Sequence, residues 1–151
     1  MPEILTPRMI TDRADIDAVM EFVRRFPLDY PQYDAWLELC KRQLQLGKKN
    51  GFYITDQGIV GSIIFQAHHS DTIVMEVKNL RVDPEHCNQG HGALLCQTVE
   101  KLAIERGFRG IMVDTHSHLV IDFLEKRGYE VIESADLYKR GQLENVLLKV
   151  F

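Results

Sequence analysis

Cysteine is scarce in this sequence, which contains Cys40, Cys87 and Cys96 and no others. An odd set without a Cys-x-x-Cys pair predicts neither a disulfide framework nor a cysteine zinc site. Long hydrophobic runs are also lacking, since no stretch of about 18 uncharged apolar residues is present to span a bilayer. Residues 1–4 have neither the basic nor the apolar region of a secretion signal. We therefore expect a cytoplasmic protein with no membrane partner.

An excess of basic residues is missing as well. The chain has 18 Lys and Arg against 22 Asp and Glu, which gives a net charge of −4 at pH 7. Nonspecific nucleic-acid binding depends on an excess of cations, so we expect no nucleic-acid partner. The 151 residues are 45% hydrophobic and 26% charged, which is typical of one soluble globular domain with its own core. We therefore assign residues 1–151 to a single domain.

Four helices are predicted along the chain. Thr11 or Asp12 is a suitable cap for a first helix, whose apolar residues between 16 and 23 recur at a spacing of three and four and which should end near Pro27. A second helix is predicted over residues 33–44, with a stop at Gly47. A third covers the apolar positions 95–103, and Ser117 caps a fourth that closes at residues 126–128.

Short runs rich in β-branched and aromatic residues predict strands at 52–55, 59–65, 72–82 and 111–113, and in the tail at 129–132 and 146–151. The links at 56–58 and 69–71 are too short for a crossover, so the first three strands form an antiparallel meander. A strand, a helix and a strand then make a right-handed crossover, which places the strand around Val113 parallel to the one around Leu80. We expect an α/β fold: a mixed, mostly antiparallel sheet of about six or seven strands with about four helices.

The most informative segment follows the strand that ends at Val82. Two glycines, Gly90 and Gly92, open the third helix after a turn that contains a proline. Glycine allows positive φ and a close approach of a bulky anion, and the free N–H groups of a helix start form an anion cradle. A tight turn with close helix packing is the plainer interpretation. A dinucleotide fingerprint is excluded by Leu95 at the third small position, and a Walker loop by the absence of Gly-Lys-Ser/Thr.

With these residues in place, the sequence resembles the GNAT family of acetyl-CoA-dependent N-acetyltransferases along nearly its whole length. The resemblance includes the strand end at residues 80–84, the glycine turn and helix, and residues 123–129. It implies that main-chain groups of Leu80 and Val82 pair with pantetheine and that N–H groups from Cys87 to Ala93 hold the pyrophosphate of acetyl-CoA. The cofactor-binding residues it implies are Leu80, Arg81, Val82, Cys87, Asn88, Gln89, Gly90, His91, Gly92, Ala93, Ser117, Phe123 and Lys126.

The turn departs from the family pattern at its first position, where Cys87 replaces the usual arginine or glutamine. The cradle consists of main chain, so we expect weaker cofactor binding rather than none. A thiol at a helix start is also a candidate nucleophile, although the plainer interpretation of Cys87 is a small residue that fills the turn.

Acetyl transfer to an amine requires a group that accepts the amine's proton. Glu76 precedes Val82 by six residues on the same strand, an offset that matches the base in the histone-acetyltransferase branch of the family. The position of the tyrosine that often protonates the departing thiolate is taken by Leu124 here. Tyr138, Ser117 and His116 are the alternatives, or the thiolate leaves unassisted. We assign Glu76 and Tyr138 as the catalytic candidates.

We expect no metal, because the neighbours His68 and His69 would point in opposite directions on a strand and residues 116–118 have no further ligand nearby. The partner we expect is a small-molecule or peptide amine, since antibiotics, polyamines, amino acids and protein N-termini are all acceptors on this scaffold. Exposed tail strands are compatible with a homodimer. The predicted function is direct N-acetylation of a primary amine by acetyl-CoA in a ternary complex. The alternative is an idle acyl-CoA-binding or regulatory module of the same fold.

Overall fold

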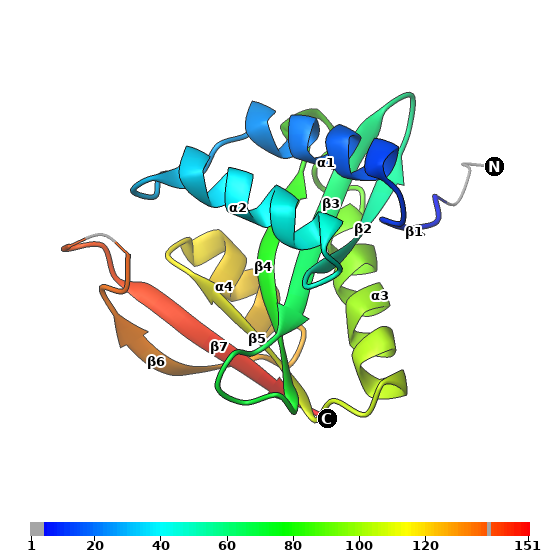
Figure 1. Cartoon of the computed structure of the whole chain (residues 1–151). Helices are drawn as coiled ribbons and strands as arrows, with labels where there is room; N and C mark the ends of the chain where they lie inside the picture. The colour runs from blue at the N-terminus through cyan, green and yellow to red at the C-terminus, as the bar shows by residue number, and fades with distance from the viewer. Residues whose placement is uncertain (1–4, 139) are drawn as a thin grey trace. The chain divides into compact units, whose positions relative to one another are not determined.

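The computed structural model describes residues 5–138 and 140–151, and it confirms an α/β fold (Figure 1). Within these residues the seven strands follow the order β1-β2-β3-β4-β5-β7-β6 and form a mixed sheet. The elements in chain order are β1 (Arg8–Met9), α1 (Arg13–Arg25), α2 (Tyr33–Gln45), β2 (Asn50–Thr55), β3 (Ile59–Ala67), β4 (Val74–Val82), the 3₁₀ helix η1 (Pro84–His86), α3 (His91–Glu105), β5 (Gly110–Thr115), α4 (His118–Glu125), β6 (Glu130–Ala135) and β7 (Glu144–Val150).

The described chain divides into two compact units. Unit 1 consists of residues 5–66 and 79–99, and unit 2 of residues 67–78 and 100–151. The boundaries between them fall inside β3, after Gln66, inside β4, after Lys78, and inside α3, after Val99. All three elements therefore contribute residues to each unit.

Unit 1 contains the predicted pair of amino-terminal helices with a hydrophobic core. Asp12 is the cap of α1, because its side chain accepts a hydrogen bond from the Asp15 N–H, and Phe26 ends the helix as predicted. The buried core of this unit consists of Ile10, Ile16, Val19, Met20, Phe22, Val23, Tyr33, Leu37, Cys40, Leu44 and Ile64. Apolar faces of α1 and α2 thus meet residues of the sheet, which is the arrangement that their spacing favours.

Unit 1 also contains the antiparallel strands β1, β2 and β3. In the first pair Met9 lies opposite Phe52, and in the second Phe52 lies opposite Ile63. Gly51 of β2 is close to the neighbouring chain, since an added Cβ would lie 2.6 Å from the Ile63 carbonyl oxygen. The two-residue strand β1 was not predicted, because a periodicity of two has no room to show in so short a segment.

In unit 2 the first half of β4 pairs in parallel with β5, which in turn pairs antiparallel with β7, and β7 with β6. The parallel direction predicted for the strand around Val113 is confirmed, but Val113 pairs with Val77 and not with Leu80. In Figure 1, α4 lies against this part of the sheet, beside β7. None of the described helices is long and apolar enough to cross a membrane.

Candidate functional site

The glycine turn of unit 1 has the conformation that its residues predict. After η1 the chain takes positive φ at Asn88 (62°) and Gly90 (83°), and α3 begins at His91. The Leu94 N–H reaches back to the Gly90 carbonyl at 2.9 Å and makes the first helical turn. The N–H groups of the preceding helical residues have no carbonyl earlier in the helix to bind. The turn therefore offers main-chain donors and the positive end of the α3 dipole at one place.

Close packing against β3 holds the start of α3 in position. A Cβ added to Gly61 would lie 3.2 Å from Leu95 Cδ1, 3.5 Å from the Arg81 carbonyl oxygen and 3.9 Å from His91 Cβ. His91 itself is 7% exposed, so its imidazole is buried and its contribution to an anion site is its backbone N–H. The Asp83 N–H binds the Val60 carbonyl at 2.8 Å, which ties the end of β4 to the same strand.

Cys87 lies at the end of η1 rather than at the start of α3. Its thiol is exposed and donates a hydrogen bond to the Pro84 carbonyl oxygen at 3.0 Å. The hypothesis of a thiol activated by the helix start is therefore wrong in its geometry, because His91, not Cys87, begins the helix. The side chains of the next two residues, Asn88 and Gln89, are exposed.

Arg81 turns its side chain toward the end of α1. Its Nε donates to the Phe26 carbonyl at 3.2 Å and its Nη1 to the Leu80 carbonyl at 3.0 Å. Burial lowers the pKa of the Arg81 guanidinium, and the nearby Tyr33 and Tyr30 oppose that effect. One acceptor position of the Leu80 carbonyl is thus already used by the protein.

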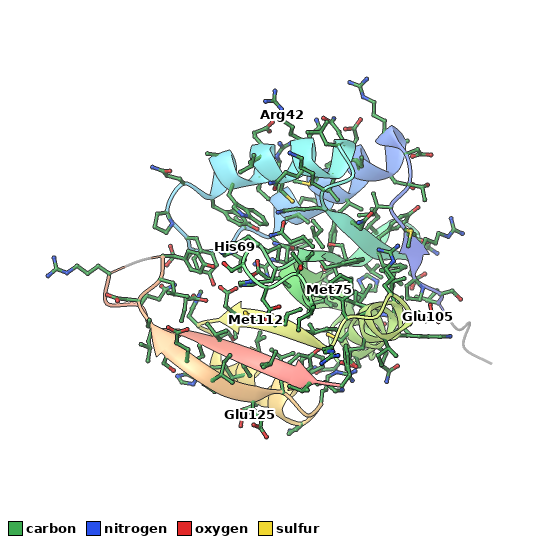
Figure 2. All side chains as sticks on the ribbon, turned by 60° about the horizontal axis from the view of Figure 1, so that its bottom comes forward. Arg42, His69, Met75, Glu105, Met112 and Glu125 are labelled. Carbon is green, nitrogen blue, oxygen red and sulfur yellow. The ribbon has the colours of Figure 1, made fainter. Side chains whose placement is uncertain are left out.

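Glu76, the predicted base, lies in unit 2 and is 7% exposed. The Lys78 ammonium is 2.6 Å from its Oε1, and His68 Nε2 is 3.5 Å from its Oε2. In the parallel ladder Glu76 pairs with Met112 of β5, a residue labelled in Figure 2. Because alternate residues share a face of a sheet, Glu76 and Lys78 lie on the same face of β4.

Tyr138, the predicted proton donor, interacts with three carboxylates of unit 2. Desolvation raises the pKa of the Tyr138 phenol most, followed by the charge of Asp114 and a hydrogen bond to it, and then by the charges of Glu144 and Glu76. Tyr138 is 46% exposed, so solvent screens these charges. Glu76, Asp114 and Glu144 are called the carboxylate cluster below. Both predicted catalytic residues thus belong to unit 2, and the charge of Glu76 acts on Tyr138.

Two members of the carboxylate cluster, Asp114 and Glu144, were not found from the sequence. Asp114 pairs with Val146 of β7, and Glu144 is the residue two positions before Val146 on the same strand. The two carboxylates therefore lie on one face of the sheet as a result of strand register. Only the pairing of β5 with β7 could have revealed this, and a single sequence does not show that pairing.

The other proton-donor candidates already have structural roles. His116 Nδ1 is 3.1 Å from Oε1 of the fully buried Glu144. The Ser117 hydroxyl accepts the Val120 N–H at 3.4 Å and is the predicted cap of α4. Leu124, which takes the position of the family's tyrosine and cannot donate a proton, is 1% exposed and belongs to the core.

Two further residues that the resemblance assigns to the cofactor lie on or beside α4. Phe123 has the Arg127 guanidinium 5.7 Å from its ring centre. Lys126 follows the last helical residue and is exposed. Phe123 therefore has a contact within unit 2. Cofactor binding by Phe123 and Lys126 stays a prediction.

Among the residues that the structure describes, His68, His69 and Glu76 have possible metal-ligand atoms that all lie within 4.8 Å of one another. The expectation that the two histidines point in opposite directions is wrong, because β3 ends at Ala67 and their ring centres are 4.6 Å apart. Metal binding is nevertheless disfavoured. His68 Nδ1 accepts the N–H groups of the turn that follows it, and the Lys78 ammonium already occupies one oxygen of Glu76.

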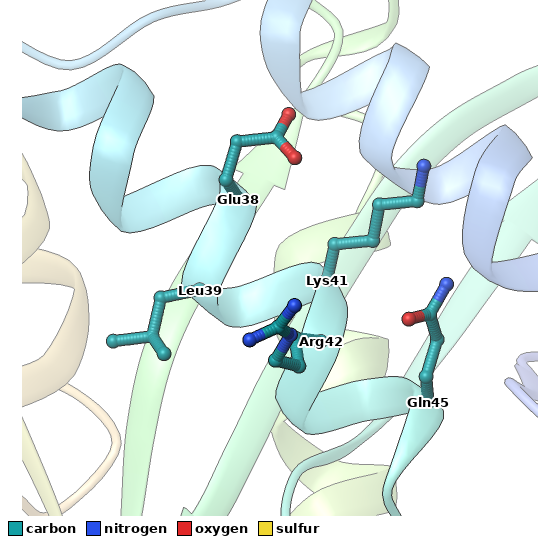
Figure 3. A pocket seen from close by; sticks show the side chains of 5 residues that line it. All are labelled: Glu38, Leu39, Lys41, Arg42 and Gln45. Atoms are coloured by element: carbon teal, nitrogen blue, oxygen red, sulfur yellow. The ribbon is translucent and has the colours of Figure 1, made fainter.

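A shallow pocket on unit 1 runs along α2 (Figure 3), where it is lined by Glu38, Leu39, Lys41, Arg42 and Gln45. Two of these side chains form ion pairs with residues of α1: Glu38 pairs with Arg24, and Lys41 Nζ lies 3.5 Å from Asp17 Oδ1. All five residues come from one helix, and no convergent set of buried polar groups lines the pocket. We therefore do not place the reaction there.

Comparison with known proteins gives a family match. The model of the acetyltransferase (GNAT) family matches residues 16–129. The amino-acid acetyltransferase of Pasteurella multocida (strain Pm70) is 24% identical over 124 residues, which cover 82% of this chain. They cover 27% of the relative, so the chain spans about a quarter of the length of the curated protein it matches.

Solved structures show the same fold at low sequence identity. A protein from Desulfovibrio desulfuricans assigned to the GNAT family has a TM-score of 0.84 at 15% identity, over 97% of this chain and 99% of that one. PaiA N-acetyltransferase from Thermoplasma acidophilum, in complex with coenzyme A, has a TM-score of 0.74 at 15% identity, over 99% and 100%. The ribosomal-protein-S18-alanine N-acetyltransferase from Escherichia coli has a TM-score of 0.72 at 14% identity, over 96% and 94%.

Proposed function

The chain belongs to the acetyltransferase (GNAT) family, and from this premise we propose that it transfers an acetyl group from acetyl-CoA directly to a primary amine in a ternary complex. The observation that carries the proposal is the conformation of the glycine turn, with positive φ at Asn88 and Gly90 just before α3 begins. Support also comes from the similarity of the chain to an amino-acid acetyltransferase and to a solved N-acetyltransferase in complex with coenzyme A.

The cofactor would be held mainly by main chain. N–H groups between Cys87 and Ala93 would bind the pyrophosphate, each charge-assisted hydrogen bond contributing about 1.5–3 kcal/mol against about 0.3–1 kcal/mol from the helix dipole. Backbone groups of Leu80 and Val82 would pair with the pantetheine amides in the manner of an added strand. Acetyl-CoA, when bound, supplies the thioester whose carbonyl carbon the amine attacks.

Glu76 would accept the proton that the amine must lose. A lysine-like ammonium has a pKa of about 10.4, so about one molecule in a thousand is neutral at pH 7. The new bond joins the amine nitrogen to the acetyl carbon, the bond to sulfur breaks, and the thiolate leaves. Tyr138 would return a proton to that sulfur, because a phenol is protonated at neutral pH.

The carboxylate cluster supports a cationic acceptor. Glu76 and Glu144 are nearly or fully buried, and with Asp114 they all act on Tyr138. Lys78 balances the charge of one of the three carboxylates, and the negative charge that remains favours the approach of an ammonium group over that of a carboxylate. The acceptor class is therefore a primary amine that carries positive charge before it reacts, on a small molecule or a peptide.

The alternative, an idle acyl-CoA-binding module, is favoured by Cys87 and Leu124 at positions where the family usually has polar groups. Release of free thiol from acetyl-CoA in the presence of a panel of amines separates the two functions. Turnover that depends on the acceptor supports the enzyme. Saturable binding of CoA, measured by calorimetry, without any such turnover supports the module.

The role of Glu76 is tested by the Glu76→Gln variant. We expect kcat/KM to fall by about 10²-fold or more, because general base catalysis typically contributes about 10²–10⁴-fold. Calorimetry should show an unchanged Kd for CoA. A variant with the kcat/KM and pH profile of the parent would exclude Glu76 as the base.

A further inference from the structure

We propose that His68 is a positioning residue for Glu76. Its imidazole, fixed in a single tautomer by the turn after β3, directs an Nε2–H at one oxygen of the Glu76 carboxylate and holds that side chain in place. The proposal rests on the proposed function, in which Glu76 is the base. All the residues involved belong to unit 2.

The turn between β3 and β4 determines the tautomer of His68. His68 Nδ1 accepts hydrogen bonds from the backbone N–H groups of Ser70 at 3.2 Å and Asp71 at 3.1 Å. A proton on Nδ1 would face both N–H groups, so Nδ1 has to remain an acceptor. In the neutral ring the proton is then on Nε2. Residue identities do not indicate this tautomer, because the partners of Nδ1 are backbone groups.

The turn is itself held by hydrogen bonds at its base. The His68 N–H binds the Val74 carbonyl at 2.8 Å, and the Val74 N–H binds the Asp71 carbonyl at 3.0 Å. The Asp71 side chain accepts the Ile73 N–H at 3.3 Å. The backbone on either side of the imidazole is therefore tied down, and the ring is oriented by groups that do not take part in the reaction.

Glu76 has one donor directed at each of its oxygens. Lys78 Nζ lies 2.6 Å from Oε1, and His68 Nε2 lies 3.5 Å from Oε2. The side chains of Glu76 and His68 are 10% and 17% exposed, so water competes little for this contact. At 3.5 Å the His68 contact is long, as catalytic contacts often are before substrate binds. His68 thus acts on the reaction through the orientation of Glu76.

His69 provides a matched control. It stacks on His68 with ring centres 4.6 Å apart and is exposed. No ion pair with Glu76 is recorded for it among residues 5–138 and 140–151, whereas His68 has one. Replacing His69 therefore removes an imidazole from the same turn and leaves the contact with Glu76 in place.

Three variants distinguish loss of the contact between His68 and Glu76 from disruption of the turn after β3. In His68→Asn the amide oxygen takes the position of Nδ1 and keeps the turn, while the Nε2–H is lost. In His68→Gln the amide N–H reaches toward Glu76. We expect kcat for His68→Asn to fall about tenfold or more, as the loss of one hydrogen bond to a charged group predicts, with Tm and the Kd for CoA unchanged. His68→Gln should recover part of the loss, and His69→Asn should behave as the parent.

A double-mutant cycle distinguishes positioning from a structural role. In the Glu76→Gln background, His68→Asn should have no further effect on kcat. An equal fall in both backgrounds would overturn the proposal, because the histidine would then act independently of Glu76. Unchanged activity in the parent background would overturn it as well. If Glu76→Gln alone left kcat/KM unchanged, the assigned base would be wrong, which is a separate failure.

The tautomer is measured without reference to activity. Nitrogen-15 NMR of the imidazole in the full chain should show His68 protonated at Nε2 and not at Nδ1, with the Nε2–H resonance shifted in Glu76→Gln. A ring protonated at Nδ1, or an Nε2–H resonance that does not respond to Glu76→Gln, would overturn the proposal even where the variants have lost all measurable turnover.

Discussion

Cys87 is the residue at which the glycine turn departs most from the pattern of the family. Its thiol is directed back to the Pro84 carbonyl, and the side chain is exposed. Replacing it with arginine would place a cation beside the proposed pyrophosphate site. Because the position is exposed, we expect the binding free energy of CoA to become more favourable by about 0.5–1.5 kcal/mol.

For Cys87→Arg this gain corresponds to a roughly two- to tenfold lower Kd for CoA, measured by calorimetry. Cys87→Ser is the control and should bind as the parent does. The gain for the arginine variant should diminish at high salt, since it is electrostatic. An unchanged Kd for Cys87→Arg would indicate that the phosphates bind elsewhere.

Asp15 controls a pH-dependent part of the stability of unit 1. Its pKa is lowered, chiefly by the hydrogen bond from the Thr11 N–H, and the Tyr53 hydroxyl and the Thr11 side chain also donate to it. A carboxylate with a lowered folded-state pKa stabilises the fold above its unfolded value near 3.8. That contribution is lost as the pH falls through the lower pKa of the folded state.

We therefore expect Asp15→Asn to lower the free energy of unfolding by about 1 kcal/mol at pH 7. The difference from the parent should shrink as the pH is lowered below 3.8. Urea unfolding at a series of pH values measures both curves. A difference that did not depend on pH would show that packing, rather than charge, is the role of Asp15.

The individual site residues differ in how far the sequence could predict them. Glu76 was assigned because its offset from Val82 on one strand matches the base in the family that the sequence resembles, and its role stays a prediction. Asp114 and Glu144 required the register of β5 with β7. The contact of His68 with Glu76 required a turn whose hydrogen bonds are made by backbone groups, and backbone partners leave no trace in residue identity.

At the scale of elements, the helix ends were predictable because their signals are local. Asp12 and Ser117 are the caps of α1 and α4, as their side-chain chemistry predicts. The 3₁₀ helix η1 was missed, although Asp83 caps it by accepting the Glu85 N–H and Pro84 fixes its first φ. Three residues are too few for a periodic pattern, so a turn was the natural interpretation.

Gly90 determines how the chain enters α3. Its φ is +83°, and an added Cβ would meet nothing within 4 Å, so the cost of a side chain is conformational rather than steric contact. Alanine at such a φ costs roughly 1–2 kcal/mol, whereas asparagine adopts this region more readily. We expect Gly90→Ala to lower the free energy of unfolding by about 1 kcal/mol and Gly90→Asn by less.

The two Gly90 variants also report on the anion site, because either side chain would stand where a phosphate is proposed to approach the backbone. Both should raise the Kd for CoA, although they differ in stability. A variant that lost stability and kept the parent's affinity would place the pyrophosphate away from this turn.

At the scale of the whole molecule, the mixed sheet and the antiparallel meander were predictable from alternation and link length, and the crossover rule gave the parallel pair. The register of that pair was not predictable, because the hydrophobic pattern of a strand buried on both faces does not mark one offset over another. The division into two units was not predicted either. It concerns contacts between distant segments, which composition does not reveal.

Cofactor binding should stabilise the folded chain as a whole. A ligand present at about 100 times its Kd adds about 2.7 kcal/mol to the free energy of unfolding, which for a chain of this length raises Tm by roughly 5–10 °C. Thermal unfolding with and without CoA measures the rise, and pantetheine, which lacks the pyrophosphate, should give a smaller one. No rise with CoA at millimolar concentration would contradict the proposed cofactor.

The division of β4 and α3 between the units has a consequence for dissection of the chain. Three crossings, after Gln66, Lys78 and Val99, separate the segments of one unit from those of the other. A truncation from the amino end that passes Gln66, or from the carboxyl end that passes Glu100, therefore removes residues of both units together. Neither unit is a continuous segment of the chain, so neither can be cloned as one fragment. Genetic complementation by two fragments of the chain would require breakpoints in the loops rather than at these crossings.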